Sequence, residues 1–265
     1  PDEYDFPYVY ADTVDIKWEI DANMMRVNKI RDSFDIYRDS KLDGELRFQP
    51  DKLGGAGSFY FDLSEIQSED FDFKYNKLRK IGVEEFIIFH PSAQYNYKIY
   101  PKHLREVLLK YLNNLGVAIL VTGAKNKIDI EIKLNLPTMQ NIYDFISETS
   151  LEEYIALSYL AKAYVGMDTL NMHIAAMQNK TIFAIFGPTN LTMWSPWCNN
   201  LKKGASENTP VQEYGNITIF QADLPCVACG KAGCNDDKGR SDCLQAIKPE
   251  TIFNSVRTWY GNEDF

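Results

Sequence analysis

The chain has 265 residues, 45% of them hydrophobic and 25% charged, a composition typical of a globular protein large enough to bury a substantial core. Its formal net charge is −9 and its pI is about 4.9, which argues against a nucleic-acid-binding protein or one held to a membrane by a basic patch. No apolar run approaches the roughly 18 to 20 residues of a membrane span, and no signal-peptide pattern is present, so we expect a cytoplasmic protein.

The first 83 residues show little regular pattern. We predict a helix over residues 19–34, a strand at 45–50 ("ELRFQP") and a second helix over 74–82. The segment between them, residues 51–73, has the glycines and mixed polarity of loop and strand.

From residue 85 onward, short apolar runs alternate with amphipathic segments. The predicted helix over residues 150–163 begins at Ser150, which with Glu153 has the spacing of a capping box. This alternation predicts right-handed βαβ units, and therefore an α/β fold with a mostly parallel, Rossmann-like sheet covered by helices on both faces. The predicted strands are 85–90, 117–123, 141–147, 164–166 and 181–187, and the other predicted helices are 101–116, 124–136 and 169–180.

In such sheets ligands bind at the carboxyl ends of the strands, so the turns after the strands are the candidate site. These turns carry glycines that allow close backbone approach and hydroxyls that can donate to phosphate oxygens. The amides that open the helix after Gly166 also favour an anion, so we predict a phosphate at Asp168 and Thr169. The candidate residues in these turns are Ser92, Thr122, Gly123, Gly166, Asp168, Thr169, Gly187 and Thr189.

Four cysteines near the carboxyl terminus have the spacing C-x2-C-x4-C-x8-C. In a reducing compartment this cluster indicates either a structural metal site or free thiols, rather than a disulfide framework. If a metal is bound, four thiolates favour zinc over iron and a closed structural site. The four residues are Cys226, Cys229, Cys234 and Cys243.

Three stretches carry a resemblance to a known family: "FIIFHPSAQYNYKIYP" at residues 86–101, "YVGMDTLNMHIAAMQNKTIFAIFGPTN" at 164–190, and the cysteine segment with "IKPETIFNSV". Together, over residues 85–257, they resemble glycosyltransferase family 9, which includes the ADP-heptose:lipopolysaccharide heptosyltransferases. The resemblance implies a GT-B architecture, in which two Rossmann-like domains face each other across a cleft and the carboxyl-terminal one binds the nucleotide-sugar donor.

The resemblance also implies roles for individual residues. Lys98 would contact the donor phosphate or sugar, and Asp168 would meet the sugar hydroxyls, which makes these two the candidate catalytic residues. The Thr169 hydroxyl and nearby amides would hold the diphosphate, and His173 would brace that turn. Stabilisation of the leaving diphosphate by Lys98 and helix-end amides is electrostatic catalysis that requires no cofactor.

Structural interpretations of the same residues stay open. Asp168 could serve only as a helix cap, and Lys98 could be a solvated surface lysine. His173 could be a core histidine whose hydrogen bonds are satisfied. Trp194 and Trp197 are expected to be packing groups that border the ligand at most.

Two departures from the family pattern affect the expected domain organisation. Leu170 stands where the family usually has glycine after Asp-Thr, and its side chain restricts the backbone there. The family's amino-terminal strand and Gly-rich turn with the catalytic aspartate have no counterpart in residues 1–83. We therefore expect residues 1–83 to be a remnant of the acceptor-side domain with a linker, and 84–265 to be the donor-binding domain, with its Cys-rich segment at 226–243. Such a chain would be a fragment that binds its donor without turning over.

The leading functional hypothesis is inverting transfer of a heptose, or a related sugar, from an ADP-sugar to a bacterial cell-surface glycan or lipopolysaccharide core acceptor. This would take place in the cytoplasm, with peripheral association at the inner face of the inner membrane. Two alternatives remain: a non-catalytic sugar-nucleotide binding module, and a GT-B enzyme that uses another nucleotide sugar.

Overall fold

The computed structural model describes residues 78–262 except Asp236 and Lys238, together with the backbone of four strands nearer the amino terminus. Those strands are β1 (Val14–Asp21), β2 (Met24–Lys29), β3 (Leu46–Phe48) and β4 (Gly57–Phe61).

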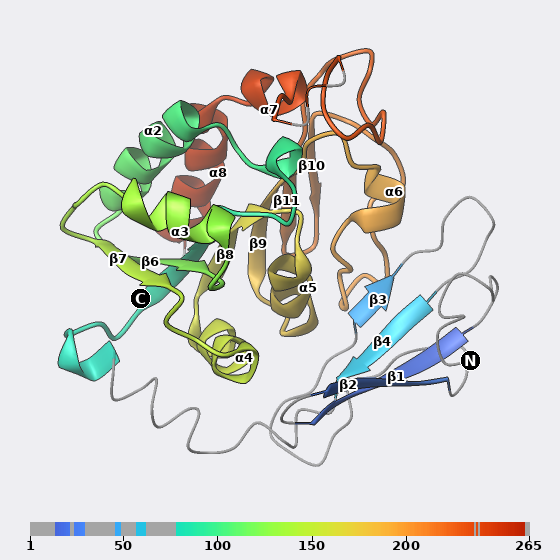
Figure 1. Cartoon of the computed structure of the whole chain (residues 1–265), viewed down its shortest axis with the longest axis horizontal. Coiled ribbons are helices and arrows are strands. Elements are labelled where there is room, and N and C mark those ends of the chain that lie inside the picture. The colour runs from blue at the N-terminus through green and yellow to red at the C-terminus, as the bar shows by residue number, and fades with distance from the viewer. Residues whose placement is uncertain are drawn as a thin grey trace.

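The main body is built on a seven-stranded sheet with the order β10-β11-β9-β8-β5-β6-β7 (Figure 1). Neighbouring strands are parallel except β10, which pairs antiparallel with β11 at the edge. Counted along the chain, the parallel strands follow the 3-2-1-4-5-6 order of a doubly wound Rossmann sheet, which confirms the predicted fold class. The strands are β5 (Phe86–His90), β6 (Ala118–Gly123), β7 (Ile142–Ile146), β8 (Ala163–Met167), β9 (Thr181–Ile185), β10 (Val211–Tyr214) and β11 (Ile217–Phe220).

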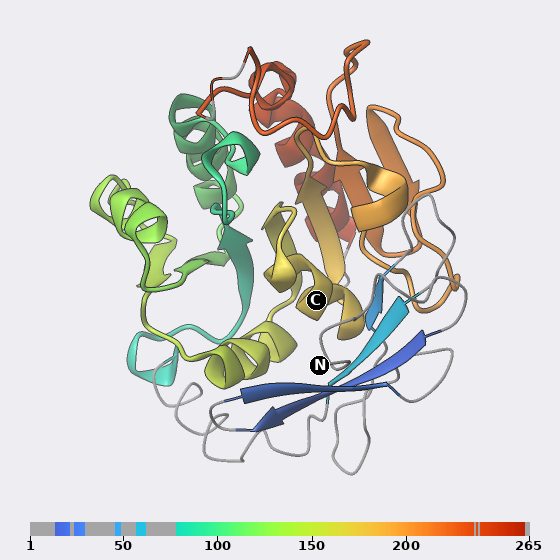
Figure 2. The same ribbon diagram turned by 45° about the vertical axis from the view of Figure 1, so that its right-hand side comes forward.

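Helices cover both faces of this sheet (Figures 1 and 2). The helices are α2 (Lys102–Asn113), α3 (Lys127–Leu134), α4 (Leu151–Leu160), α5 (Leu170–Met177), α6 (Leu191–Trp194), α7 (Asp242–Ala246) and α8 (Pro249–Asn262), with a short 3-10 helix at Asn96–Lys98. Apolar residues of α4 and α5 pack in one core cluster, and those of α2, α3 and α8 pack in the other.

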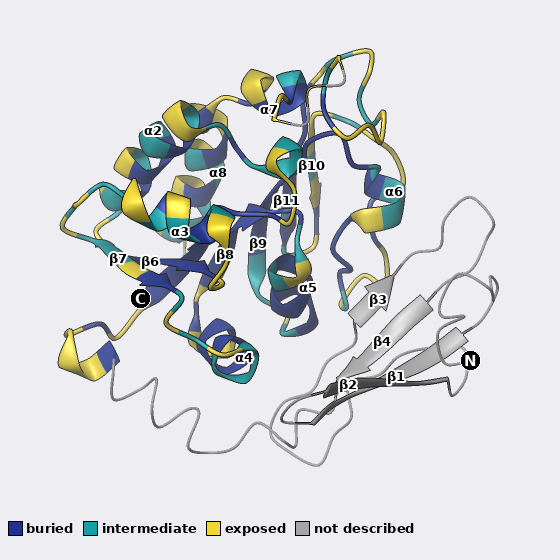
Figure 3. Ribbon diagram, in the orientation of Figure 1, coloured by how far each residue is buried: buried dark blue, intermediate teal, exposed yellow. Residues whose placement is uncertain are grey.

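Strand β5 shows why its sequence is apolar throughout. Its alternate residues enter different cores, since Phe86 and Ile88 pack beneath α4 and α5 whereas Ile87 and Phe89 pack beneath α2 and α8. A strand with a core on each face has no solvent side, so its sequence reads as a continuous apolar run. Figure 3 shows the consequence, a sheet that is buried along its centre.

The start of α4 is fixed by the predicted capping box. The Ser150 hydroxyl accepts from the backbone N–H of Glu153 at 3.1 Å, and the Glu153 carboxylate accepts from the Ser150 N–H at 2.7 Å.

We expect Ser150→Ala to lower the free energy of unfolding by about 1 kcal/mol, because one helix N–H loses its acceptor. Ser150→Thr should stay within a few tenths of a kcal/mol of the wild type, since threonine also caps. Urea unfolding of both variants measures the difference, and equal stabilities would contradict this assignment of the cap.

The amino-terminal strands correct one prediction. The helix expected over residues 19–34 is wrong where the chain is described, because β1 and β2 pair antiparallel from Ile16–Lys29 to Asp21–Met24. Polar and apolar residues alternate in "VDIKWEID", which is the period of a strand. Residues 22–23 and 30–34 lie outside the described residues.

These strands form a separate four-stranded sheet with the order β2-β1-β4-β3. The strand predicted at 45–50 is confirmed as β3, and β4 lies in the segment expected to mix loop and strand. Of the helix predicted over 74–82, residues 78–80 are helical and 74–77 lie outside the described residues. The division of the chain into a remnant over 1–83 and a donor domain over 84–265 stays a prediction.

Candidate functional site

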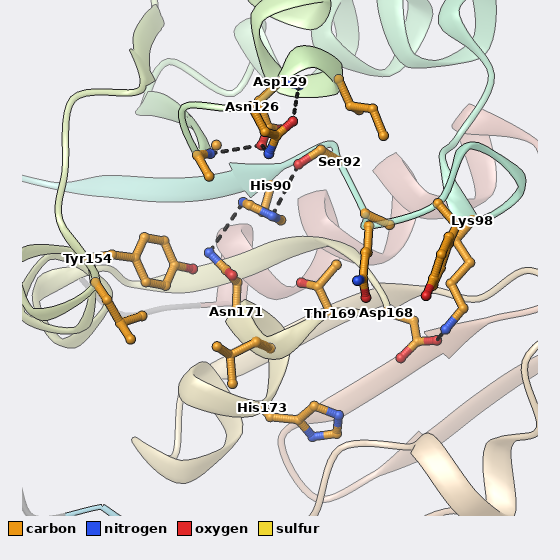
Figure 4. Close-up of a pocket in the computed structure, with 18 of the residues that line it drawn as sticks. His90, Ser92, Lys98, Asn126, Asp129, Tyr154, Asp168, Thr169, Asn171 and His173 are labelled. Carbon is orange, nitrogen blue, oxygen red and sulfur yellow. Dashed lines mark hydrogen bonds and ion pairs between the residues drawn. The ribbon is translucent and has the colours of Figure 1, made fainter. Parts of the chain in front are cut away.

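A cavity of about 940 Å³ opens at the carboxyl end of the parallel strands (Figure 4). Its lining comes from the turns after β5, β6 and β8 and from the first turns of α3, α4 and α5. β5 and β8 are neighbours in the sheet, and the strand order reverses between them. The cavity therefore lies at the topological switch point, the place where doubly wound sheets bind their ligands.

An ion pair between Lys98 and Asp168 lies at one side of the cavity (Figure 4). The Lys98 ammonium donates to the Asp168 carboxylate at 2.9 Å, and the carboxylate is buried whereas the lysine side chain is 23% exposed. Removing two charges from water offsets much of their attraction, so such a pair is weak support for a purely stabilising role. The Lys98 ammonium can bind an anionic oxygen, and the neighbouring Asp168 carboxylate can accept a hydrogen bond from a hydroxyl group.

Thr169, and not Asp168, occupies the N-cap position of α5; its backbone angles are extended, at −149° and 173°, and its side chain makes no cap hydrogen bond. The carboxylate of Asp168 is bonded to Lys98 instead. The amino-terminal end of α5 lies at the cavity, which Thr169, Leu170 and Asn171 line. Leu170 is 40% exposed there.

His173 lies in α5, lines the same cavity and is buried. Burial lowers its pKa to about 4; the nearby Lys98 charge acts in the same direction, whereas Asp168 opposes it. The ring is therefore neutral at ordinary pH, and the bracing role predicted for His173 stays a prediction.

Six of the predicted site residues line the cavity together. They are Ser92, Lys98, Gly123, Asp168, Thr169 and His173.

The other four predicted site residues do not line the cavity. Thr122 is fully buried, and its hydroxyl is bonded to the ring of His90 at 3.0 Å. A Cβ at Gly166 would lie 2.4 Å from the carbonyl oxygen of His90, and one at Gly187 would lie 3.2 Å from Leu244. These two glycines therefore serve the packing of the sheet and its turns.

Thr189 belongs to a turn whose backbone carbonyls are hydrogen-bonded by the side chain of Gln221. The side-chain amide of Gln221 donates to the carbonyl of Thr189 at 3.1 Å and lies 3.4 Å from that of Gly187. Thr189 is itself buried, which removes its hydroxyl from the cavity surface.

Several residues that sequence reasoning passed over also line the cavity: His90, Asn126, Asp129, Tyr154 and Asn171. Asn126 caps α3 by accepting from the N–H of Asp129, and the Asp129 carboxylate accepts from the N–H of Ala124, both at 2.9 Å. The signal was present in the sequence, since "NKID" has asparagine and aspartate at cap spacing. The pair fixes the turn after β6.

Aromatic side chains border the cavity. Tyr95 and Tyr97 stack with ring centroids 5.4 Å apart, and Trp194 is 38% exposed. Trp197, by contrast, is buried, in agreement with its expected packing role. Trp194 is thus the tryptophan that borders the cavity.

The four clustered cysteines all line one small cavity beneath the turn at Pro188. Cys226 and Cys229 are exposed and Cys243 is buried. Within the described residues, however, no three or more His, Cys, Asp or Glu side chains come close enough together to hold a metal ion. The predicted metal centre is therefore not assembled in this arrangement. Burial raises the pKa of Cys243, which keeps that sulfur a thiol.

Two buried histidines make stability depend on pH. Burial lowers the pKa of both His90 and His173 from 6.5 to about 4, so each binds a proton more readily in the unfolded chain. Their contribution is fully present above about pH 6.5 and is lost as the pH falls toward 4, with a slope of at most ~1.4 kcal/mol per pH unit for each histidine.

We expect His173→Gln to have a flatter decline of unfolding free energy between pH 7 and pH 5 than the wild type. Urea unfolding at both pH values measures this, and the carboxylates common to both proteins cancel in the comparison. Identical declines would show that His173 is protonated equally in the folded and unfolded chains.

In the part of the chain that the structure describes, no helix has the length and apolar character needed to cross a membrane.

Comparisons with known proteins agree on one family. Residues 58–221 match the sequence model of glycosyltransferase family 9 (heptosyltransferase). The chain is 26% identical over 156 residues to lipopolysaccharide heptosyltransferase 3 of Escherichia coli (strain K12). This match covers 56% of this chain and 44% of that protein. A 99-residue match to lipooligosaccharide heptosyltransferase 2 of Campylobacter jejuni is 26% identical and covers 37% of this chain and 26% of that protein. The chain thus spans less than half the length of the curated relatives it matches.

Two solved structures share the fold. The E. coli ADP-heptose lps heptosyltransferase II superposes with a TM-score of 0.55 at 19% identity, covering 74% of this chain and 53% of that one. A glycosyl transferase family 9 protein from Veillonella parvula superposes with a TM-score of 0.57 at 15% identity, covering 75% of this chain and 53% of that one. Identities this low support the fold alone.

Proposed function

The chain belongs to glycosyltransferase family 9, the heptosyltransferases, and from this we propose that its cavity binds the donor in sugar transfer from an ADP-sugar. The transferred sugar is a heptose or a close relative, and the acceptor is a bacterial cell-surface glycan such as the lipopolysaccharide core. The observation that carries the proposal is the Lys98–Asp168 pair, which joins the turns after β5 and β8 at the switch point.

The geometry supports a division of roles across the cavity. A diphosphate is placed with its oxygens toward Lys98 and the opening amides of α5, because both supply positive charge to an anion. The sugar is placed beside Asp168, whose carboxylate can accept from a sugar hydroxyl.

In the proposed reaction, an acceptor hydroxyl oxygen attacks the anomeric carbon as the bond from that carbon to the diphosphate oxygen breaks. The ADP leaves with the bonding electron pair, and the hydroxyl proton passes to a base. Attack opposite the leaving group inverts the anomeric centre. Lys98 acts by stabilising the negative charge that develops on the leaving diphosphate, which is the electrostatic form of catalysis. We assign the base to none of the residues that the structure describes.

A second candidate is a sugar-nucleotide binding module that does not turn over. It is favoured by Leu170, which replaces the family's usual glycine at the first position of α5 and lines the cavity. This candidate shares the donor site and differs only in the transfer step.

Calorimetric titration of the chain with ADP, UDP and GDP tests the proposal. We expect ADP to bind at least ~10-fold more tightly than the other two, which corresponds to a difference of about 1.4 kcal/mol. Equal binding of the three would refute the ADP-sugar donor, and absence of binding by all three would refute the donor site. Sugar transfer by the intact gene product separates the enzyme from the module.

A further inference from the structure

His90 ends β5 at the floor of the cavity, and both of its ring nitrogens are hydrogen-bonded (Figure 4). Nδ1 lies 3.0 Å from the Thr122 hydroxyl and 3.4 Å from the amide nitrogen of Asn171. Nε2 lies 3.3 Å from the hydroxyl oxygen of Ser92. The ring of Tyr154 meets the imidazole edge-on, with centroids 6.3 Å apart. His90 thus joins β6, α4 and α5 to the turn that carries Ser92.

The neighbours of the ring determine which nitrogen carries its proton. Burial lowers the pKa of His90 to about 4, although Asp129 opposes this, so the ring is neutral and has one donor and one acceptor nitrogen. The Asn171 amide nitrogen can only donate, and the structure turns it toward Nδ1. With this donor facing it, Nδ1 is assigned as the acceptor and Nε2 as the nitrogen that carries the proton. The Thr122 hydroxyl is compatible with this tautomer because a hydroxyl can donate to Nδ1.

This tautomer fixes the hydroxyl of Ser92. The serine oxygen accepts from Nε2–H, so its own hydrogen must point in another direction. Ser92 is buried yet lines the cavity, so the space in front of its hydroxyl is where the ligand would lie.

We propose that His90 is a positioning residue: its Nε2–H holds the Ser92 oxygen so that the Ser92 hydroxyl donates to an anionic oxygen of the bound diphosphate. The inference rests on the proposed donor site, but it concerns the diphosphate and is independent of the base and the sugar. A histidine that only packs the core would make the same contacts without controlling anion affinity.

Two substitutions separate these roles. In His90→Gln the side-chain amide nitrogen reaches the place of Nε2 and keeps the donor to Ser92. In His90→Asn the shorter amide reaches only the place of Nδ1, so that donor is lost. His103→Asn, on the exposed surface of α2, is the matched control.

The affinity for inorganic pyrophosphate and for ADP is measured by calorimetry, with urea unfolding of each variant alongside. We expect His90→Asn and Ser92→Ala each to weaken binding about 10- to 100-fold, the loss expected for one hydrogen bond to a charged group. His90→Gln should stay within about 2-fold, as should His103→Asn. The double variant His90→Asn/Ser92→Ala should bind no more weakly than Ser92→Ala alone, because both changes remove one interaction.

Three results would overturn the proposal. The first is multiplied effects in the double variant, which would mean that His90 acts apart from Ser92. The second is a His90→Asn variant that loses stability but no affinity. The third is an Nδ1–H tautomer in the ¹⁵N NMR spectrum of the ligand-free chain. If pyrophosphate binding follows the expected cycle while ADP is not preferred over UDP and GDP, the ADP-donor proposal fails and the role of His90 stands. If neither pyrophosphate nor any nucleotide binds, both fail.

Discussion

Replacing Lys98 with methionine is expected to lower the rate of sugar transfer by the intact gene product about 10²- to 10³-fold, and to weaken ADP binding about 10- to 100-fold. Methionine keeps an unbranched chain but removes the ammonium that lies 2.9 Å from Asp168 and faces the cavity. The effect on rate should exceed the effect on affinity because the diphosphate gains negative charge as it leaves.

This substitution also leaves the buried Asp168 carboxylate without its cation, which destabilises the fold. Lys98→Met/Asp168→Asn removes both charges and should restore much of the stability while transfer remains lost. Lys125→Met, at an exposed lysine on the turn after β6 that does not line the cavity, should change the rate less than about 2-fold. A Lys98→Met protein that is folded and transfers sugar at the wild-type rate would remove Lys98 from the proposed mechanism.

The parts of the fold that sequence predicts well are those with a strong local signal. Apolar runs of strand length identify β5, β6 and β9, and the Ser150–Glu153 spacing identifies the start of α4. Strands β1 and β2 lie where a helix is predicted because the alternation of apolar and polar residues, regular from Val14 to Asn23, is broken by two consecutive apolar residues at Met24 and Met25. Over such a length the two periodicities are hard to separate.

The candidate site could be predicted only to the level of its turns. Sequence places Thr122 and Gly123 together at the end of β6, but the pleat of the strand sends them to different places: Gly123 lines the cavity and Thr122 bonds His90. In the sequence, His90 is only the residue that ends the apolar run of β5. Its role depends on Asn171, which lies 81 residues away and reaches it only through the order of the strands in the sheet.

Gly166→Ala should be among the most destabilising single substitutions in the sheet. The added Cβ would lie 2.4 Å from the carbonyl oxygen of His90 and 2.8 Å from the hydroxyl of Tyr164, and His90 is the residue paired with Gly166 across β5 and β8. Because the closest atom belongs to a backbone held in the sheet, the strands must separate to admit the methyl group. We expect a loss of about 2 to 3 kcal/mol and a fall in melting temperature on the order of 5 to 10 °C.

The matched control is Gly261→Ala in α8, where no heavy atom lies within 4 Å of the added Cβ. Alanine there should leave stability unchanged or raise it by up to about 1 kcal/mol, since it favours the helix more than glycine does. Thermal unfolding of both variants measures the contrast, and equal melting temperatures would show that β5 and β8 tolerate the methyl group.

The same pair of variants separates two interpretations of Gly166. If the glycine were needed for a phosphate to approach the backbone, alanine would weaken ADP binding in a protein of normal stability. The structure favours the second interpretation, that the glycine is needed for close packing of β5 against β8, because Gly166 does not line the cavity. Separation of β5 from β8 would displace His90 and the start of α5 together. Any loss of ADP affinity in Gly166→Ala should therefore be accompanied by a loss of unfolding free energy.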